Sequence, residues 1–126
     1  MFGLMQDWPL LMHKVLDHAA IQHPGREIIS RSVEGPFHRT DYRAVRLRAL
    51  RLAQRLERDG IRLGDRVATL AWNTWRHVEA WYGITGIGAI YHTVNPRLFP
   101  DQIAWILNHA GSRVLMLDLT FIPLIQ

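Results

Sequence analysis

Three short apolar segments recur between residues 66 and 118: Arg66-Val67-Ala68-Thr69-Leu70-Ala71, Ala89-Ile90-Tyr91-His92-Thr93-Val94 and Arg113-Val114-Leu115-Met116-Leu117-Asp118. Each has the length of a strand, and helical patterns separate one segment from the next. Strands that are apolar on both faces and alternate with helices are typical of a parallel sheet covered by helices. The sequence therefore predicts an α/β fold with a three-stranded parallel sheet.

Helices are expected over residues 10–22, 41–59, 74–83 and 100–109, with Thr40 or Asp41 as the N-cap of the second and Asn73 as that of the third. The turn Glu34-Gly35-Pro36 between two β-like runs predicts a small N-terminal hairpin. The glycines at 83, 86 and 88 are expected to loosen the end of the third helix. We divide the chain into a helix and hairpin region (1–40), βα units (41–118) and an apolar, truncated end (119–126).

The helix over residues 41–59 has an apolar stripe of the width expected for a core-facing helix. Its opposite side carries five arginines: Arg43, Arg48, Arg51, Arg55 and Arg58. Leu47 projects among these arginines and Leu50 lies at their margin, which suggests a second packing surface. Together with the apolar residues Phe121 to Ile125, these leucines predict a homo-oligomer, most simply a symmetric dimer. The tryptophans 72, 75, 81 and 105 are expected to fill the core.

The composition indicates a globular domain of 126 residues, with 48% apolar residues and no cysteine. No apolar run is long enough to span a membrane, and the first residues lack a basic signal region, so we expect a cytoplasmic protein. Of the 15 basic residues, 14 are arginine, for a net charge of +4. Because these arginines are dispersed, we favour a solvated helix face over a nucleic-acid-binding surface.

The segment His92 to Leu98 is the best local candidate for a site. It sits at the carboxyl end of the second predicted strand, which is the middle one in sequence order, and open parallel sheets place ligands at the carboxyl ends of their strands. His92 and Asn95 offer hydrogen bonds, and Arg97 is suited to an anionic group. The alternative is a structured turn in which Arg97 pairs with Asp101. The seven histidines show no metal-ligand spacing, and no phosphate loop or nucleophile with a base follows any of the three strands. We therefore identify no catalytic, cofactor-binding or metal-binding residue.

Three motifs in order resemble the adenylate-forming enzymes, and in particular the acyl-CoA synthetases: Thr40-Asp41-Tyr42-Arg43-Ala44-Val45, Leu63-Gly64-Asp65-Arg66-Val67-Ala68 and Gly88-Ala89-Ile90-Tyr91-His92-Thr93-Val94-Asn95-Pro96-Arg97-Leu98. The form of the third is closest to that of bacterial medium- and long-chain fatty-acid ligases. The resemblance covers roughly residues 11–118 and implies the N-terminal part of the large AMP-binding domain.

The resemblance implies that a parent enzyme converts a fatty acid, ATP and coenzyme A into acyl-CoA, AMP and pyrophosphate, with Mg²⁺ assisting. The family's phosphate loop, its adenine- and ribose-binding residues and its C-terminal lysine have no counterpart here. We therefore expect this segment to be inactive alone, to bind no cofactor, and to have the remainder of the enzyme as its partner. The rivals are another adenylate-forming activity, such as acyl-AMP or amino-acid adenylation, and a non-catalytic, arginine-rich nucleic-acid-binding module.

Overall fold

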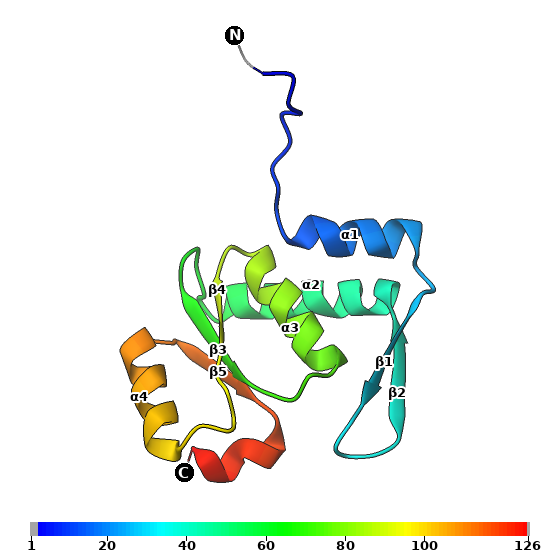
Figure 1. Ribbon diagram of the computed structural model, residues 1–126. Coiled ribbons are helices and arrows are strands. Elements are labelled where there is room, and N and C mark those ends of the chain that lie inside the picture. Colours follow the sequence, from blue (N-terminus) through cyan, green and yellow to red (C-terminus); the bar gives the residue numbers. More distant parts are fainter. Residues whose placement is uncertain (1–2, 126) are drawn as a thin grey trace.

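A computed structural model describes residues 3–125 and confirms the predicted α/β architecture (Figure 1). An exposed, extended arm over residues 3–11 precedes the first helix, α1, so the helix predicted from residue 10 begins at His13. The elements follow in the order α1 (His13–Gln22), β1 (Glu27–Arg31), β2 (Phe37–Asp41), α2 (Tyr42–Arg58), β3 (Arg66–Leu70), α3 (Trp75–Gly86), β4 (Ile90–Thr93), α4 (Pro100–Ala110), β5 (Val114–Leu117) and a 3-10 helix, η1 (Leu119–Leu124).

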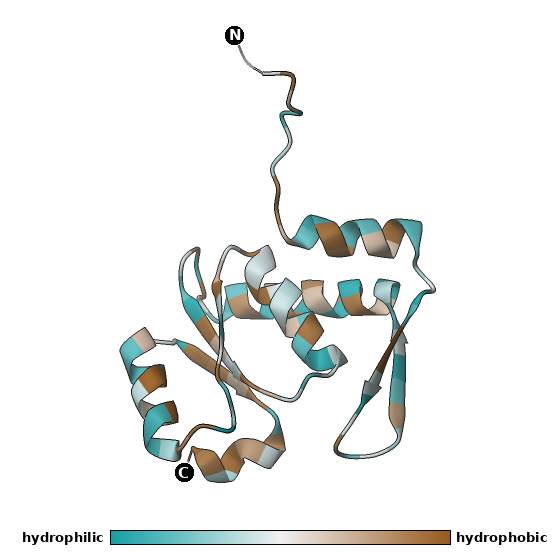
Figure 2. Ribbon diagram, viewed as in Figure 1, coloured by the Kyte–Doolittle hydropathy of each residue, from teal (hydrophilic) through white to brown (hydrophobic). Residues whose placement is uncertain are grey.

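The parallel sheet has the strand order β4-β3-β5, and β1 and β2 form a separate antiparallel hairpin. The strand that is the middle one in sequence, β4, thus lies at an edge of the sheet, while β3 is central. This order explains the burial: four of the five residues of β3 are buried, whereas Ile90 of β4 is 47% exposed. β3 and β5 are apolar over most of their length, as Figure 2 shows.

Alternation along the strands divides the core between the two faces of the sheet. Val67 and Tyr91 pack on the α3 side with the end of α2, while Ala68 and Leu70 pack on the other side against α4 and η1. A third cluster joins α1, α2 and the hairpin around Leu16, which is buried. The domain therefore has three layers, with α2 and α3 covering one face of the sheet.

α2 and α3 pack closely at Gly83, which corrects the expected end of α3. A Cβ at Gly83 would lie 2.9 Å from the carbonyl oxygen of Ala49 and 3.2 Å from the Leu52 side chain. The glycine therefore permits close packing inside the helix, and α3 continues to Gly86. Between the same helices, Arg48 Nε lies 2.7 Å from Glu79 Oε1. Burial raises the pKa of Glu79, and the Arg48 hydrogen bond opposes this shift.

The local predictions had mixed outcomes at the helix ends and turns. Asp41 caps α2 as predicted, because its carboxylate accepts a hydrogen bond from the Ala44 N–H at 2.7 Å. Gly64, in the turn between α2 and β3, has a φ of +83°, in the left-handed region that favours glycine. The N-cap of α3 is Thr74, one residue later than the predicted Asn73.

The structure also tests the expected packing of the large apolar residues. Trp75 is buried, but the other three tryptophans of the predicted core are 38–62% exposed, namely Trp72, Trp81 and Trp105. Leu47 and Leu50 are 50% and 44% exposed, in agreement with their positions on the polar side of α2. Phe121 was expected at the surface and is instead buried under the sheet, since η1 turns it into the α4 side of the core. No helix between residues 3 and 125 is long and apolar enough to cross a membrane.

Candidate functional site at the carboxyl edge of the sheet

A groove of about 970 Å³ runs along the carboxyl ends of β3 and β4. We call it the carboxyl-edge groove. Its walls come from four places: the end of the hairpin strand β1 and the residues after it, the loop after β3, the first turn of α3, and the end of β4 with the segment after it. It is lined by Arg31, Ser32, Val33, Ala71, Trp72, Asn73, His77, Thr93, Val94, Asn95, Pro96 and Arg97. This is the position at which open parallel sheets bind small molecules.

A second recess, the α3–β4 slot, has a volume of about 390 Å³ and adjoins the groove. The two share Asn73, His77 and Thr93. One wall of the slot is a face of α3 and the other is formed by Tyr91 and Thr93, which are two residues apart and so point to the same side of β4. The groove therefore continues into a narrower, more aromatic recess.

The structure brings two of the three predicted site residues together. Asn95 and Arg97 both line the groove, and the Asn95 side-chain oxygen accepts a hydrogen bond from the Arg97 N–H at 2.9 Å. This local bond is the structured turn that was the alternative interpretation. Its other element, an ion pair of Arg97 with Asp101, is not found among residues 3–125.

His92 lies apart from this pair. It occupies the next position along β4 after Tyr91, so its side chain points to the α4 side of the sheet. There, His92 Nδ1 lies 2.9 Å from the hydroxyl of Ser112. His92 does not line the groove, and a role close to a substrate stays a prediction for all three residues.

His77 is the groove residue that sequence reasoning missed. It lies on α3 and its Nε2 is 3.0 Å from Thr69 Oγ1 at the carboxyl end of β3. Its ring is 5.7 Å from that of Tyr91, and burial lowers the pKa of His77 while the charge of Asp118 opposes this shift. Burial also raises the pKa of the Tyr91 hydroxyl. Burial thus favours the neutral form of the His77 imidazole, which stands where the groove and the slot meet.

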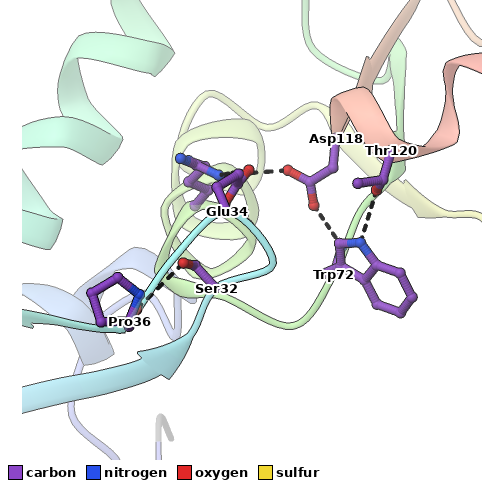
Figure 3. A network of polar contacts seen from close by, with 7 residues as sticks. Ser32, Glu34, Pro36, Trp72, Asp118 and Thr120 are labelled. Carbon is purple, nitrogen blue, oxygen red and sulfur yellow. Dashed lines mark hydrogen bonds and ion pairs between the residues drawn. The ribbon is translucent and has the colours of Figure 1, made fainter.

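A polar network holds the loop that forms one wall of the groove (Figure 3). The backbone N–H of Trp72 donates to Asp118 at 2.7 Å, and its indole N–H donates to Thr120 at 2.9 Å. Arg76 lies 3.0 Å from Glu34 and 3.9 Å from Asp118. The Arg76 hydrogen bond lowers the pKa of Glu34. The loop is thus tied both to the hairpin and to the start of η1.

The residues at this edge do not fit a nucleotide triphosphate or a metal. The N-terminal end of α3, a natural anion site, is closed, because the Trp75 N–H donates to the buried Ser30 hydroxyl at 3.0 Å. The positive-φ glycines of residues 3–125, at positions 60, 64, 88 and 111, are not consecutive, and none of them lines the groove. Residues 3–125 contain no group of three or more histidine, aspartate or glutamate residues that could hold a metal ion. We therefore assign no step involving ATP or Mg²⁺ to these residues.

An open parallel sheet with a ligand-sized groove at its carboxyl edge is the architecture of an α/β enzyme for small molecules. Residues 16–123 match the family model described as AMP-binding enzyme, and the chain belongs to that family. It is 46% identical over its whole length to the 3-methylmercaptopropionyl-CoA ligase of Ruegeria pomeroyi, and 45% identical over 97% of its length to the long-chain-fatty-acid–CoA ligase of Thermus thermophilus. It covers 23% of each of these relatives.

The fold also matches a solved structure, the fatty acyl CoA synthetase of Mycobacterium tuberculosis. The match has a TM-score of 0.81 and 28% sequence identity, and it covers 90% of this chain and 22% of the other. Both kinds of comparison therefore confirm the resemblance to acyl-CoA synthetases. They relate the chain to less than a quarter of the length of those enzymes.

Proposed function

We propose that this chain is the N-terminal part of an acyl-CoA ligase that activates a fatty acid or a related carboxylic acid. The carboxylate would attack the α-phosphate of ATP to give an acyl-adenylate and pyrophosphate, and coenzyme A would then displace AMP to form the thioester. The observation that supports this most directly is the 46% identity, over the whole chain, to an enzyme named as a CoA ligase.

Within such an enzyme, the described residues would form a wall of the acid site rather than the reacting centre. The carboxyl-edge groove is lined by Arg31, Asn95 and Arg97, which are suited to an anionic ligand. We assign no nucleophile with an adjacent base to this groove. The nucleotide, Mg²⁺ and coenzyme A would be held by other parts of the ligase. The protein would act in the cytoplasm.

Another adenylate-forming activity, such as amino-acid adenylation or acyl-AMP formation, would use the same first step. It would differ from a CoA ligase in the molecule that accepts the acyl group in the second step. A nucleic-acid-binding module has less support, because several arginines of α2 are engaged in ion pairs. Arg46 pairs with Asp17, Arg48 with Glu79 and Arg55 with Asp59. A salt-dependent titration with duplex DNA would test that alternative.

The decisive experiment uses the full-length ligase that the proposal assigns to this chain. The purified product is incubated with ATP, Mg²⁺, coenzyme A and single acids, from propionate to palmitate, with 3-methylmercaptopropionate and amino acids included. Loss of the free thiol and release of pyrophosphate are both measured. Thioester formation from a fatty or thioether acid supports the proposal, whereas pyrophosphate release without thiol loss indicates a different acceptor. No turnover of any carboxylic acid contradicts the proposal.

A matched control is the 126-residue chain alone, which we expect to release no pyrophosphate and to bind no Mg-ATP in isothermal titration. The physical reason is the closed N-terminus of α3 and the absence of a phosphate cradle among residues 3–125. Micromolar binding of Mg-ATP to this chain would contradict our assignment of the nucleotide site to other parts of the enzyme.

A further inference from the structure

The N-terminal arm, residues 3–11, carries large apolar side chains into solvent. Leu4, Met5, Trp8 and Leu10 are all 59% or more exposed. Figure 1 shows that the arm leaves the start of α1 and points away from the rest of the domain. Single exposed apolar residues are normal on a soluble surface, but a dense group of them usually marks a contact surface. The arm therefore has the composition of a segment that packs against another surface.

Local contacts fix the way in which the arm leaves α1. The Leu11 N–H donates to the Pro9 carbonyl at 3.1 Å, and the Lys14 N–H donates to the Leu11 carbonyl at 3.0 Å. Lys14 Nζ also lies 4.8 Å from the centre of the Trp8 ring, a cation–π contact. Trp8 stays mostly exposed in spite of this contact. Trp8 and Lys14 are therefore presented to solvent as a pair.

An apolar groove of about 360 Å³ lies where α1 begins, and we call it the helix groove. Its lining comes from α1, α2 and the end of α3, and includes His13, Leu50, Ala53 and Glu57. α1 runs antiparallel to α2, because Pro24 contacts Arg43 at the start of α2 while Asp17 pairs with Arg46 one turn later. α1 thus covers α2 only as far as its own first residue, His13, and the groove lies beyond that point.

The helix groove matches the Trp8 and Lys14 pair in size and in charge. Its volume of about 360 Å³ corresponds to about twelve water-sized groups at ~30 Å³ each, and a tryptophan side chain has about ten non-hydrogen atoms. Glu57 is exposed at the groove and makes no ion pair within residues 3–125. A lysine that arrives beside the tryptophan would supply the opposite charge.

We propose that two copies of this chain exchange their N-terminal arms, so that Trp8 of each copy enters the helix groove of the other and Lys14 faces Glu57 at its rim. In its own chain, Trp8 is held beside Lys14 and outside the groove. A twofold axis forms the same contact twice, and exchange of an identical element is a low-cost route to a dimer. The contact also covers Leu50, which is 44% exposed and lines the groove. This inference does not depend on the proposed function.

The first test is sedimentation equilibrium of the 126-residue chain and of arm variants. The wild type gives a species of twice the 14.6 kDa chain mass. Trp8→Ala truncates an aromatic anchor, which weakens each of the two contacts by about thirtyfold, so the mass falls toward that of one chain. Trp105→Ala removes an exposed tryptophan of α4 and leaves the dimer intact. A monomeric wild type, or a dimer that is insensitive to Trp8→Ala, overturns the proposal.

A second pair of variants tests the groove. Leu50→Asp places a charge in the helix groove and weakens the dimer by about tenfold or more, because the carboxylate is desolvated against the arriving indole. Leu119→Asp makes the same change at an exposed leucine outside the groove and leaves the dimer unchanged. Both sites are exposed, so circular dichroism of each variant should match that of the wild type. Equal weakening by the two changes overturns the assignment of the groove.

The last experiment distinguishes exchange from an arm that folds back into its own groove. Isotope-labelled and unlabelled chains are mixed, and NMR contacts are recorded only between a labelled and an unlabelled chain. We expect contacts between the Trp8 ring of one chain and the Ala53 methyl group of the other. Trp8–Ala53 contacts confined to a single chain show that each arm closes its own groove and overturn the proposal. A dimer without any Trp8–Ala53 contact overturns it as well.

Discussion

Replacing Gly83 by alanine adds one methyl group at a close contact between α2 and α3. The new Cβ would lie 2.9 Å from the Ala49 carbonyl oxygen, and backbone cannot move as a flexible side chain can. Overpacking of this kind typically costs about 1–3 kcal/mol, while alanine gains about 1 kcal/mol over glycine within a helix. We therefore expect Gly83→Ala to lower the free energy of unfolding by about 1 kcal/mol, which corresponds to a loss of about 4 °C in melting temperature.

Gly86→Ala is the matched control, since it makes the same change three residues later in α3. Its Cβ would have only His13 nearby, at 3.9 Å, which is an ordinary contact. Only the higher helix propensity of alanine then acts, so the free energy of unfolding rises by up to about 1 kcal/mol. The increase is smaller than this at a position near the end of the helix. Urea unfolding of the wild type and both variants measures the difference. If Gly83→Ala is stabilised as much as Gly86→Ala, α2 and α3 do not pack as closely as described, and the reasoning fails.

Three further predictions concern a turn, an imidazole and the oligomeric state. Gly64→Val should lower the free energy of unfolding by about 1–2 kcal/mol, because φ is +83° there while the added Cβ meets no atom; Gly35→Val, without a positive φ, should change it little in the same melting assay. Burial lowers the pKa of His77, so the folded state binds fewer protons than the unfolded state. The contribution of His77 to the free energy of unfolding is therefore fully present above the unfolded pKa near 6.5, and it decreases as the pH falls from there toward the lower folded pKa. His77→Gln should flatten this decrease in urea midpoints measured across that range, and an unchanged slope would contradict it. The exposed Leu47 and Leu50 predict a dimer of twice the 14.6 kDa chain mass in sedimentation equilibrium, whereas a single species at 14.6 kDa would contradict this.

The predictions from the sequence are confirmed where a structural feature depends on residues close together in the chain. The apolar strands and the cap at Asp41 follow from spacing and residue type within a few positions. Gly83 was misread because its reason for being glycine is Ala49, on another helix. Likewise, Asn73 was expected to cap α3, but the first helical N–H is satisfied by Ser30, 45 residues earlier.

The candidate site shows the same limit. Alternation along β4 places His92 on the opposite face of the strand from Tyr91 and Thr93. Which of the two faces lies toward the groove follows only from the strand order and from the position of α3. His77 had no signal beyond its place on the helix after β3. Its neighbours Thr69 and Tyr91 come from two different strands, and no local pattern joins them.

The loop after β3 has a consequence for the order in which the domain matures during synthesis. Trp72 is held by Asp118 and Thr120, which are 46 and 48 residues further along the chain. A ribosome therefore synthesises the loop and both walls of the slot before it makes the two side chains that fix Trp72. Chains of this kind acquire structure from the N-terminus as they emerge. The nascent domain would pair its hairpin and pack α2 on α3 first, and its carboxyl-edge groove would reach its final shape only after residue 120 has emerged.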